Sequence, residues 1–201
     1  MEIYDCVQGE KEWFALRLGS IGGSSISSVV AGGKGKMRRS LLCQFAGEIL
    51  SGQNYEGFFN KHMQRGLLEE PYARDMYEFV TDTDVVQVGV IKEGKHSHYS
   101  PDGLVGEDGL IEIKCVIPSV HIETVTTGNI PGNYEKQIQW GLHICQRKYC
   151  DFVSYSPLVT DLPIWIKRVE RNEKLIGELR EGADQFILDL AVTIRKLKEM
   201  R

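Results

Sequence analysis

One apolar stretch near the middle of the chain carries charged residues where a buried strand would ordinarily have none. Residues 100–115 read SPDGLVGEDGLIEIKC, and two apolar runs flank a turn-forming tip at residues 107–109. This pattern is typical of a β-hairpin. Asp102 opens the first strand, whereas Glu112 and Lys114 lie within the second. Buried charges are costly unless they pair with each other or bind an ion, so the surrounding fold must provide partners for them.

Helical patterns precede this hairpin, and a mixture of helical and strand patterns follows it. Apolar residues at helical spacing predict helices over residues 37–50, about 60–79, 118–127, 134–146 and 171–200. Strand-forming runs occupy residues 84–91, 96–100, 148–157 and 162–170. Pro71 predicts a kink or a helix boundary near Glu70, and the glycine- and serine-rich residues 21–36 predict a short helix between two loops. This order predicts a mixed α/β (α+β) domain with a central mixed β-sheet flanked by helices.

Length and composition indicate an ordinary globular protein. The 201 residues, 42% hydrophobic and 26% charged, predict a single domain over residues 1–201. The sequence contains no apolar run long enough for a membrane span, and its first residues lack the pattern of a secretory signal. The five cysteines form no CxxC pair, which predicts free thiols in a reducing cytoplasm rather than disulfides, zinc or an iron–sulfur cluster.

Charge is unevenly distributed along the chain. The net charge of −4 gives no general indication of nucleic-acid binding, but residues 34–39 read KGKMRR and hold four cations in six positions. A protein that binds both a metal and DNA needs this kind of separation, because acids hold the metal and a basic patch meets phosphate. A charge run that is merely solvated is the alternative interpretation.

The hairpin can bring its charged residues to one place. Pairing about the turn puts Asp102 and Glu112 at the same end of the hairpin. Because side chains alternate along a strand, Glu112 and Lys114 share a face, with Ile113 on the other. Two carboxylates, a backbone carbonyl and water are suitable ligands for Mg²⁺ or Mn²⁺. The alternative is an exposed ion pair between Glu112 and Lys114.

Several sequence blocks together resemble a known family. Pro101-Asp102 followed by Glu112-Ile113-Lys114 resembles the motif of the PD-(D/E)xK nuclease superfamily, which has a restriction-endonuclease-like core. Five blocks, WFALRLGSIGGSSISSVVA, EEPYARDMYEF, SPDGL, LIEIKC and YEKQIQWGL, follow in the order and approximate spacing of the lambda exonuclease or YqaJ-type viral recombinase family. The chain therefore resembles these phage alkaline exonucleases over about residues 13–155.

The resemblance implies a metal site. Its ligands would be Asp102, Glu112, the backbone carbonyl of Ile113, and Glu70, which matches an acid that the family carries on a helix. The neighbouring Glu69 is the rival candidate for this helical acid. The cofactor expected here is Mg²⁺, with Mn²⁺ as a substitute.

The same resemblance implies roles in catalysis beside this metal site. Lys114 would join Asp102 and Glu112 as a catalytic residue that assists attack on phosphorus, by orienting or deprotonating water or by neutralising charge. Gln137 would help to position the nucleophilic water. Gln139 projects from a different side of the same helix and is predicted to be structural.

Residues near the N-terminus match the family's pocket for the 5′-terminal phosphate of DNA. By themselves, Arg17 is an amphipathic surface arginine and Ser24 a loop or N-cap residue. With the resemblance, Arg17 would grip the phosphate and Ser24 would add a donor at a helix start. Lys34, Lys36 and Arg38 of the basic run are expected to contact DNA as well.

The implied function is a Mg²⁺-dependent 5′-to-3′ double-strand DNA exonuclease. It would act processively from 5′-phosphorylated ends and generate 3′ overhangs for phage homologous recombination, in the cytoplasm of a bacterial host. The resemblance also implies a homotrimeric ring and a single-strand annealing protein as partner. An endonuclease or junction resolvase is the alternative, and a non-catalytic DNA-binding module is a third possibility that the intact Asp102, Glu112 and Lys114 argue against.

Two further features receive structural interpretations. His96 and His98 lie on one face of a strand, which is expected to be exposed rather than to hold a metal, because no third ligand is nearby. Trp13 is expected to anchor the core rather than to stack on a base.

Overall fold

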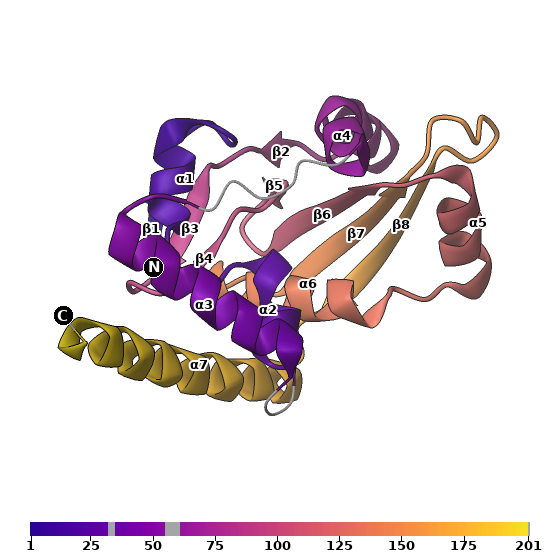
Figure 1. Ribbon diagram of the computed structural model, residues 1–201. Coiled ribbons are helices and arrows are strands. Elements are labelled where there is room, and N and C mark those ends of the chain that lie inside the picture. The colour runs from indigo at the N-terminus through magenta and orange to yellow at the C-terminus, as the bar shows by residue number, and fades with distance from the viewer. Residues whose placement is uncertain (32–34, 55–60, 201) are drawn as a thin grey trace.

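A five-stranded mixed β-sheet forms the centre of the computed structural model, which describes residues 1–31, 35–54 and 61–200 (Figure 1). Its strand order is β2-β5-β6-β7-β8. The strands are β2 (Val85–Val86), β5 (Gly103–Val105), β6 (Gly109–Cys115), β7 (Tyr149–Tyr155) and β8 (Ile164–Glu170). The pair β6–β7 is parallel and the other neighbours are antiparallel. The predicted central mixed sheet and the hairpin at residues 103–115 are therefore confirmed.

A second, three-stranded sheet was not expected from the sequence. It consists of β1 (Glu2–Tyr4), β3 (Val90–Glu93) and β4 (Ser97–Tyr99) in the order β1-β3-β4. The single strand predicted over residues 84–91 is wrong, because the chain leaves the large sheet after Val86 and enters the small one at Val90. Gly89 lies between them, and a Cβ there would stand 2.3 Å from the carbonyl oxygen of Cys6. This close approach lets the N-terminal segment pack at the crossing.

The helices agree with the sequence patterns except at two places. They are α1 (Lys11–Arg17), α2 (Gly23–Val29), α3 (Lys36–Ser51), α4 (Lys61–Thr81), α5 (Pro118–Thr127), α6 (Gly132–Ile144) and α7 (Glu173–Glu199). The first difference is α1, which the patterns did not single out. The second is Pro71, which lies inside α4, so of the two predicted alternatives, a kink or a boundary near Glu70, the boundary is wrong. Ala73 and Tyr77 are buried against the sheet, and this burial offsets the backbone hydrogen bond that proline cannot make.

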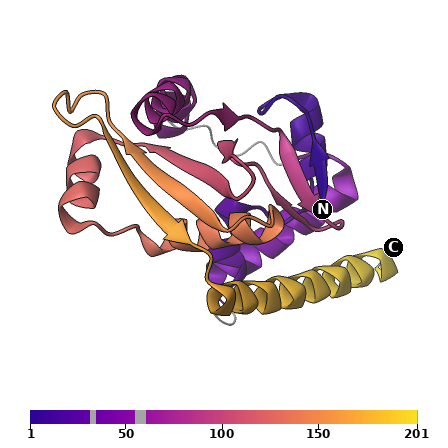
Figure 2. The same cartoon turned by 180° about the vertical axis from the view of Figure 1, so that it is seen from behind.

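The large sheet separates two hydrophobic clusters. On one face α4 packs against β6, β7 and β8, and the buried residues there include Tyr77, Ile111 and Ile113. The other face carries the larger core, in which sheet residues such as Leu110 and Phe152 meet α2, α3, α6 and α7. Figures 1 and 2 show α4 on one side of the sheet and this group of helices on the other. Strand β6 therefore has helices on both faces and sends alternate side chains to each.

Strand β4 is covered rather than exposed. Ile21 forms a parallel bridge to Ser97, its N–H donates to the carbonyl of His96 at 2.8 Å, and its carbonyl accepts from the N–H of His98 at 2.9 Å. His98 is only 4% exposed. The prediction of an exposed strand is therefore wrong for His98, because the segment before α2 folds over it.

Two predictions from composition can be compared directly with the structure. All five cysteines are free thiols, as predicted. Within the described ranges, no helix is both long enough and apolar enough to cross a membrane.

The buried Asp151 on β7 provides a test of the packing between α4 and the sheet. Its carboxylate accepts hydrogen bonds from the Tyr77 hydroxyl at 2.8 Å and from two nitrogens of Arg168, each at 2.8 Å. We expect Tyr77→Phe to lower the free energy of unfolding in urea by about 1.5–3 kcal/mol, because a buried carboxylate loses a donor. Tyr72→Phe, at an exposed position of the same helix, should change it by less than about 0.5 kcal/mol. Equal effects would contradict this account.

Candidate active site

The site forms at the start of β5, where the neighbouring strand β6 extends beyond it. The pairing of the two strands stops at Gly103 and Ile111. From Glu112 onward, β6 therefore has no partner in β5 along this edge. Asp102 takes that place, since its Oδ2 accepts the backbone N–H of Ile113 at 2.6 Å. The N–H and C=O of one strand residue lie on the same edge. The carbonyl of Ile113 therefore faces the side on which Asp102 lies.

Glu112 is the most buried of the acids predicted for the site, with 2% of its surface exposed. One carboxylate oxygen accepts from Lys114 Nζ and, at 2.6 Å, from Gln137 Nε2 of α6. The other oxygen accepts from the hydroxyl of Tyr99 on β4. Three donors from three different elements thus hold one carboxylate in place.

Tyr99 is a supporting residue that the sequence reasoning missed. Its ring lies between Gly23 of α2 and Gly141 of α6, and a Cβ on either glycine would come within 2.5 Å of the ring. The two glycines therefore allow both helices to approach β4 closely enough to fix the ring. No local pattern marked Tyr99, because its role depends on the contact with Glu112, which is 13 residues away along the chain.

Helix α4 brings a third acid to the same site. Arg74 Nη2 donates to Glu70 Oε1 at 2.5 Å, and Arg74 Nε donates to the backbone carbonyl of Asp102 at 3.0 Å. This arginine, which is 8% exposed, ties α4 to the segment before β5. Sequence reasoning missed Arg74 too, although its i,i+4 spacing from Glu70 was a usable signal.

The structure distinguishes Glu70 from its neighbour Glu69. Glu70 lies close enough for its charge to raise the pKa of Asp102. Glu69 instead pairs with Arg65 at 3.5 Å. Among the two candidates for the helical acid, Glu70 is therefore the one that lies beside Asp102 and Glu112.

The electrostatics of the site reflect an excess of acids. Burial, followed by the charges of Glu112 and Glu70, raises the pKa of Asp102 well above its usual range. Burial likewise raises the pKa of Glu70, against the opposing charge of Arg74. Burial opposes the charge on Lys114, but the charges of Glu112 and Asp102 outweigh it and raise the lysine's pKa. Lys114 is therefore a cation here, and the acids still repel one another.

The donor set suits a hard divalent cation. It consists of carboxylate oxygens from Glu70, Asp102 and Glu112 and the carbonyl of Ile113, which are ligands typical of Mg²⁺ or Mn²⁺. Burial and the charges of Glu112 and Glu70 disfavour the ionised form of Asp102, so another positive charge beside it would be favourable. In the described part of the chain, however, no three acidic, histidine or cysteine side chains already converge as a ligand set. Both oxygens of Glu112 are occupied by protein donors, so a cation would compete with Lys114 for one of them.

Arg17 lies at the end of α1 beside the segment that leads to Asp102. Its guanidinium carbon lies 3.5 Å from the ring centre of Trp13, whose Nε1 donates to Ser100 Oγ at 2.9 Å. Trp13 belongs to neither core cluster, so its prediction as a core anchor is wrong. Burial lowers the pKa of Arg17 to about 10, against the opposing charge of Glu48, which leaves the side chain charged at neutral pH.

The remaining predicted DNA contacts have different surroundings. Ser24 is exposed in the first turn of α2, and Lys36 is exposed at the start of α3. Arg38 is bound within the protein, since its Nη2 lies 2.7 Å from Asp189 Oδ2 of α7. Lys34 lies outside the described residues. A role for these four in binding DNA stays a prediction.

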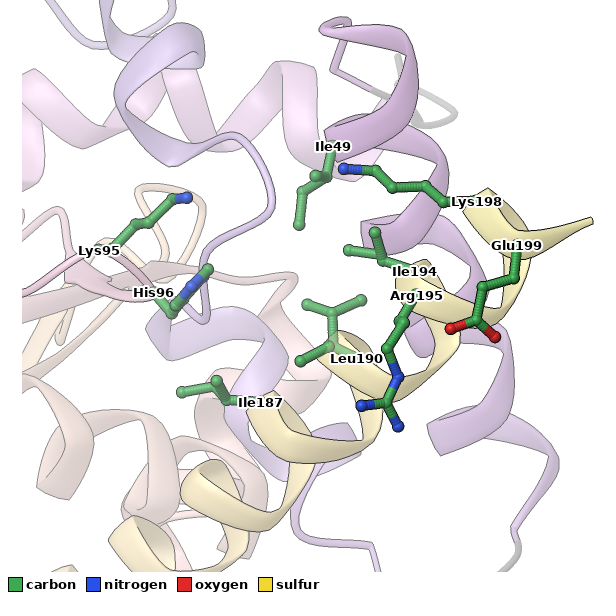
Figure 3. A pocket seen from close by; sticks show the side chains of 10 residues that line it. Ile49, Lys95, His96, Ile187, Leu190, Ile194, Arg195, Lys198 and Glu199 are labelled. Atoms are coloured by element: carbon green, nitrogen blue, oxygen red, sulfur yellow. The ribbon is translucent and has the colours of Figure 1, made fainter. Parts of the chain in front are cut away.

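Two other features lie outside the carboxylate site. Gln139 is structural, as predicted, because its amide bonds the carbonyl of Glu170 and the N–H of Asn172, each at 2.8 Å. A hollow of about 590 Å³ lies between α3, the β3–β4 turn and α7 (Figure 3). Its lining includes Lys95 and a single carboxylate, Glu199, but none of the predicted site residues, so it does not fit the metal site.

Known proteins resemble this chain in sequence and in fold. Residues 12–148, more than half of the chain, match the YqaJ-like viral recombinase domain. The crystal structure of an alkaline exonuclease (LHK-Exo) from Laribacter hongkongensis is 36% identical, with a TM-score of 0.89 over 95% of this chain and 97% of that one. The structure of LHK-Exo in complex with dAMP matches equally well.

A more distant likeness concerns the fold alone. The crystal structure of a phage related exonuclease from Haemophilus somnus 129PT is 17% identical, with a TM-score of 0.67 over 90% of this chain and 96% of that one. No curated protein matches the chain. The predicted core of the PD-(D/E)xK type is confirmed by these solved exonuclease structures. With its family model matched over most of its length, the chain belongs to the YqaJ-like viral recombinase family.

Proposed function

We propose that this protein is a Mg²⁺-dependent 5′-to-3′ exonuclease of double-stranded DNA, with Mn²⁺ as a substitute cation. It would act processively from 5′-phosphorylated ends and generate 3′ single-stranded overhangs for phage homologous recombination. Family membership and 36% identity to an alkaline exonuclease support a deoxyribonuclease that acts in recombination. The observation that carries the proposal is the buried Glu112 with Lys114 and Gln137 bound to it, beside Asp102 at an open edge of the sheet.

The chain's own residues would divide the chemistry among them. Asp102, Glu112, Glu70 and the Ile113 carbonyl would hold the cation, which when bound supplies Lewis-acid activation of the phosphate. Lys114 would neutralise charge that develops on the phosphate oxygens. The Gln137 amide donates to Glu112, which leaves its carbonyl oxygen to orient the attacking water.

The end of the DNA would be selected beside this site rather than within it. Arg17 is charged at neutral pH and can bind a terminal phosphate with two nitrogens, while the exposed Ser24 can add a hydroxyl. The short segment from Ser100 to Asp102 joins the two places, because Ser100 contacts Trp13 under Arg17 and Asp102 contacts β6. A 5′-phosphate bound at Arg17 would thus lie near the carboxylates.

Assembly and partners complete the proposal. The family resemblance supports a homotrimeric ring around the DNA, with a single-strand annealing protein as partner, in the cytoplasm of a bacterial host. Both assemblies follow from the resemblance, and the ring would account for processive digestion.

Digestion of linear duplex DNA tests the chemistry. We expect wild-type protein to degrade it in Mg²⁺ or Mn²⁺ and to be inactive in EDTA. Lys114→Ala should lower kcat at least about 100-fold, because a positive charge at the phosphate is lost. Lys148→Ala, at a 73% exposed lysine that pairs with Asp108, is the matched control and should be near wild type.

Two outcomes would contradict this proposal. Digestion by Lys114→Ala at the wild-type rate would exclude the catalytic role of the lysine. Cleavage of a covalently closed circular duplex would indicate the endonuclease or junction resolvase instead.

Comparison of duplexes with 5′-phosphate and 5′-hydroxyl ends tests the end pocket. We expect wild-type protein to prefer the phosphorylated end. Labels placed at the 5′ or the 3′ end of a strand should show that the strand is shortened from its 5′ end only. Arg17→Ala should reduce this preference about tenfold or more, because a charged hydrogen bond is worth roughly 1.5–3 kcal/mol. Arg195→Ala, at an exposed arginine of α7, should retain it. A preference that survives Arg17→Ala would show that another group receives the end.

A further inference from the structure

A buried histidine contacts the arginine of the proposed end pocket. His98 Nε2 lies 3.1 Å from Arg17 Nε, and His98 Nδ1 lies 2.9 Å from Ser20 Oγ. These partners lie about 80 residues away along the chain, Arg17 at the end of α1 and Ser20 on the segment that connects α1 with α2. Neither the metal site nor the family motif uses this histidine.

The direction of these hydrogen bonds defines the state of the ring. An arginine nitrogen can only donate, so His98 Nε2 accepts and the ring proton lies on Nδ1, which donates to Ser20. Burial, together with the charges of Arg17 and Lys92, lowers the pKa of His98 to about 3. The imidazole is therefore neutral in ordinary buffers, and its acceptor nitrogen stays available to Arg17.

The position of the imidazole is fixed independently of Arg17. The backbone N–H of His98 donates to Ile21 at 2.9 Å, and its carbonyl accepts from Trp140 Nε1 at 3.2 Å. Gly22 lies against the ring, and a Cβ there would stand 2.5 Å from Nε2. The φ of Gly22 is −108°, which any residue adopts, so this glycine is needed for space and not for its backbone conformation.

The contacts order Arg17 before any ligand arrives. His98 binds Nε, and the ring of Trp13 covers one face of the guanidinium. Within the described residues, no protein acceptor is found for the two terminal nitrogens of Arg17. A free arginine side chain would lose rotamer entropy on binding, and a side chain that is already held loses less.

We propose that His98 is a positioning residue that holds the Arg17 guanidinium ready for the 5′-terminal phosphate of DNA. The inference rests on the proposed function. It adds that the preference for phosphorylated ends depends on an acceptor at the position of His98 Nε2.

Two substitutions separate this role from mere packing. In His98→Gln the terminal amide reaches about as far as Nε2 and can still accept from Arg17. In His98→Asn the amide reaches only as far as Nδ1, so the contact with Ser20 can persist while the acceptor for Arg17 is lost. The measured quantity is the ratio of kcat/KM for a duplex with a 5′-phosphate to that for the same duplex with a 5′-hydroxyl.

We expect His98→Asn to lower this ratio about tenfold, through a higher KM for the phosphorylated duplex, and His98→Gln to retain most of it. His121→Asn is the matched control, because His121 is fully buried and its ring nitrogens bond Ser154 and Leu162. It should lose stability but keep the wild-type ratio. Gly22→Ala is a second test in case a His98 variant folds poorly. It keeps the histidine but crowds its ring, so it should also lower the ratio.

The outcomes separate this inference from the function on which it rests. If wild-type protein shows no preference for phosphorylated ends, the proposed end pocket itself fails. If wild-type protein shows the preference and His98→Asn keeps it, or His98→Gln loses as much as His98→Asn, the positioning role of His98 is wrong.

Discussion

The rest of the site depends on the hydrogen bonds that three donors make to the buried carboxylate of Glu112. An isolated carboxylate in a protein interior costs several kcal/mol, so it must be compensated where it lies. Tyr99 of β4, Lys114 of β6 and Gln137 of α6 supply the donors. Because these donors come from different elements, satisfying one charge also joins the small sheet, the large sheet and a helix.

The open edge of β6 explains why the other groups gather at this carboxylate. Strand β5 begins at Gly103, and the preceding residue Asp102 binds the backbone of β6 in place of a further strand residue. Where a strand has no neighbour along one edge, its backbone oxygens and the side chains on both of its faces can be reached from that edge. Helix α4 approaches it from one face with Glu70, and α6 approaches from the other with Gln137. The acids repel one another here, which is a reason for a cation to bind.

The proposed end pocket and the carboxylate site are linked through one short segment of chain. His98, Ser100 and Asp102 lie at alternate positions and reach Arg17, Trp13 and β6, respectively. A shift of this segment would therefore move the proposed phosphate pocket and the proposed metal ligands together. This coupling would suit an enzyme that must place a DNA end at a fixed distance from the bond it cleaves.

The hairpin and its charged residues could be predicted from the sequence because they follow from local rules. Alternation along a strand places Glu112 and Lys114 on one face and Ile113 on the other, and the turn brings Asp102 near them. Tertiary structure decided everything that depends on distant segments. It brought Glu70 close to Asp102, supplied Tyr99 and Arg74 as supporting residues, buried His98 and bound Arg38 to Asp189. The physical reason is that periodicity records only which way a side chain points, whereas its partner and its burial depend on which helix or loop packs there.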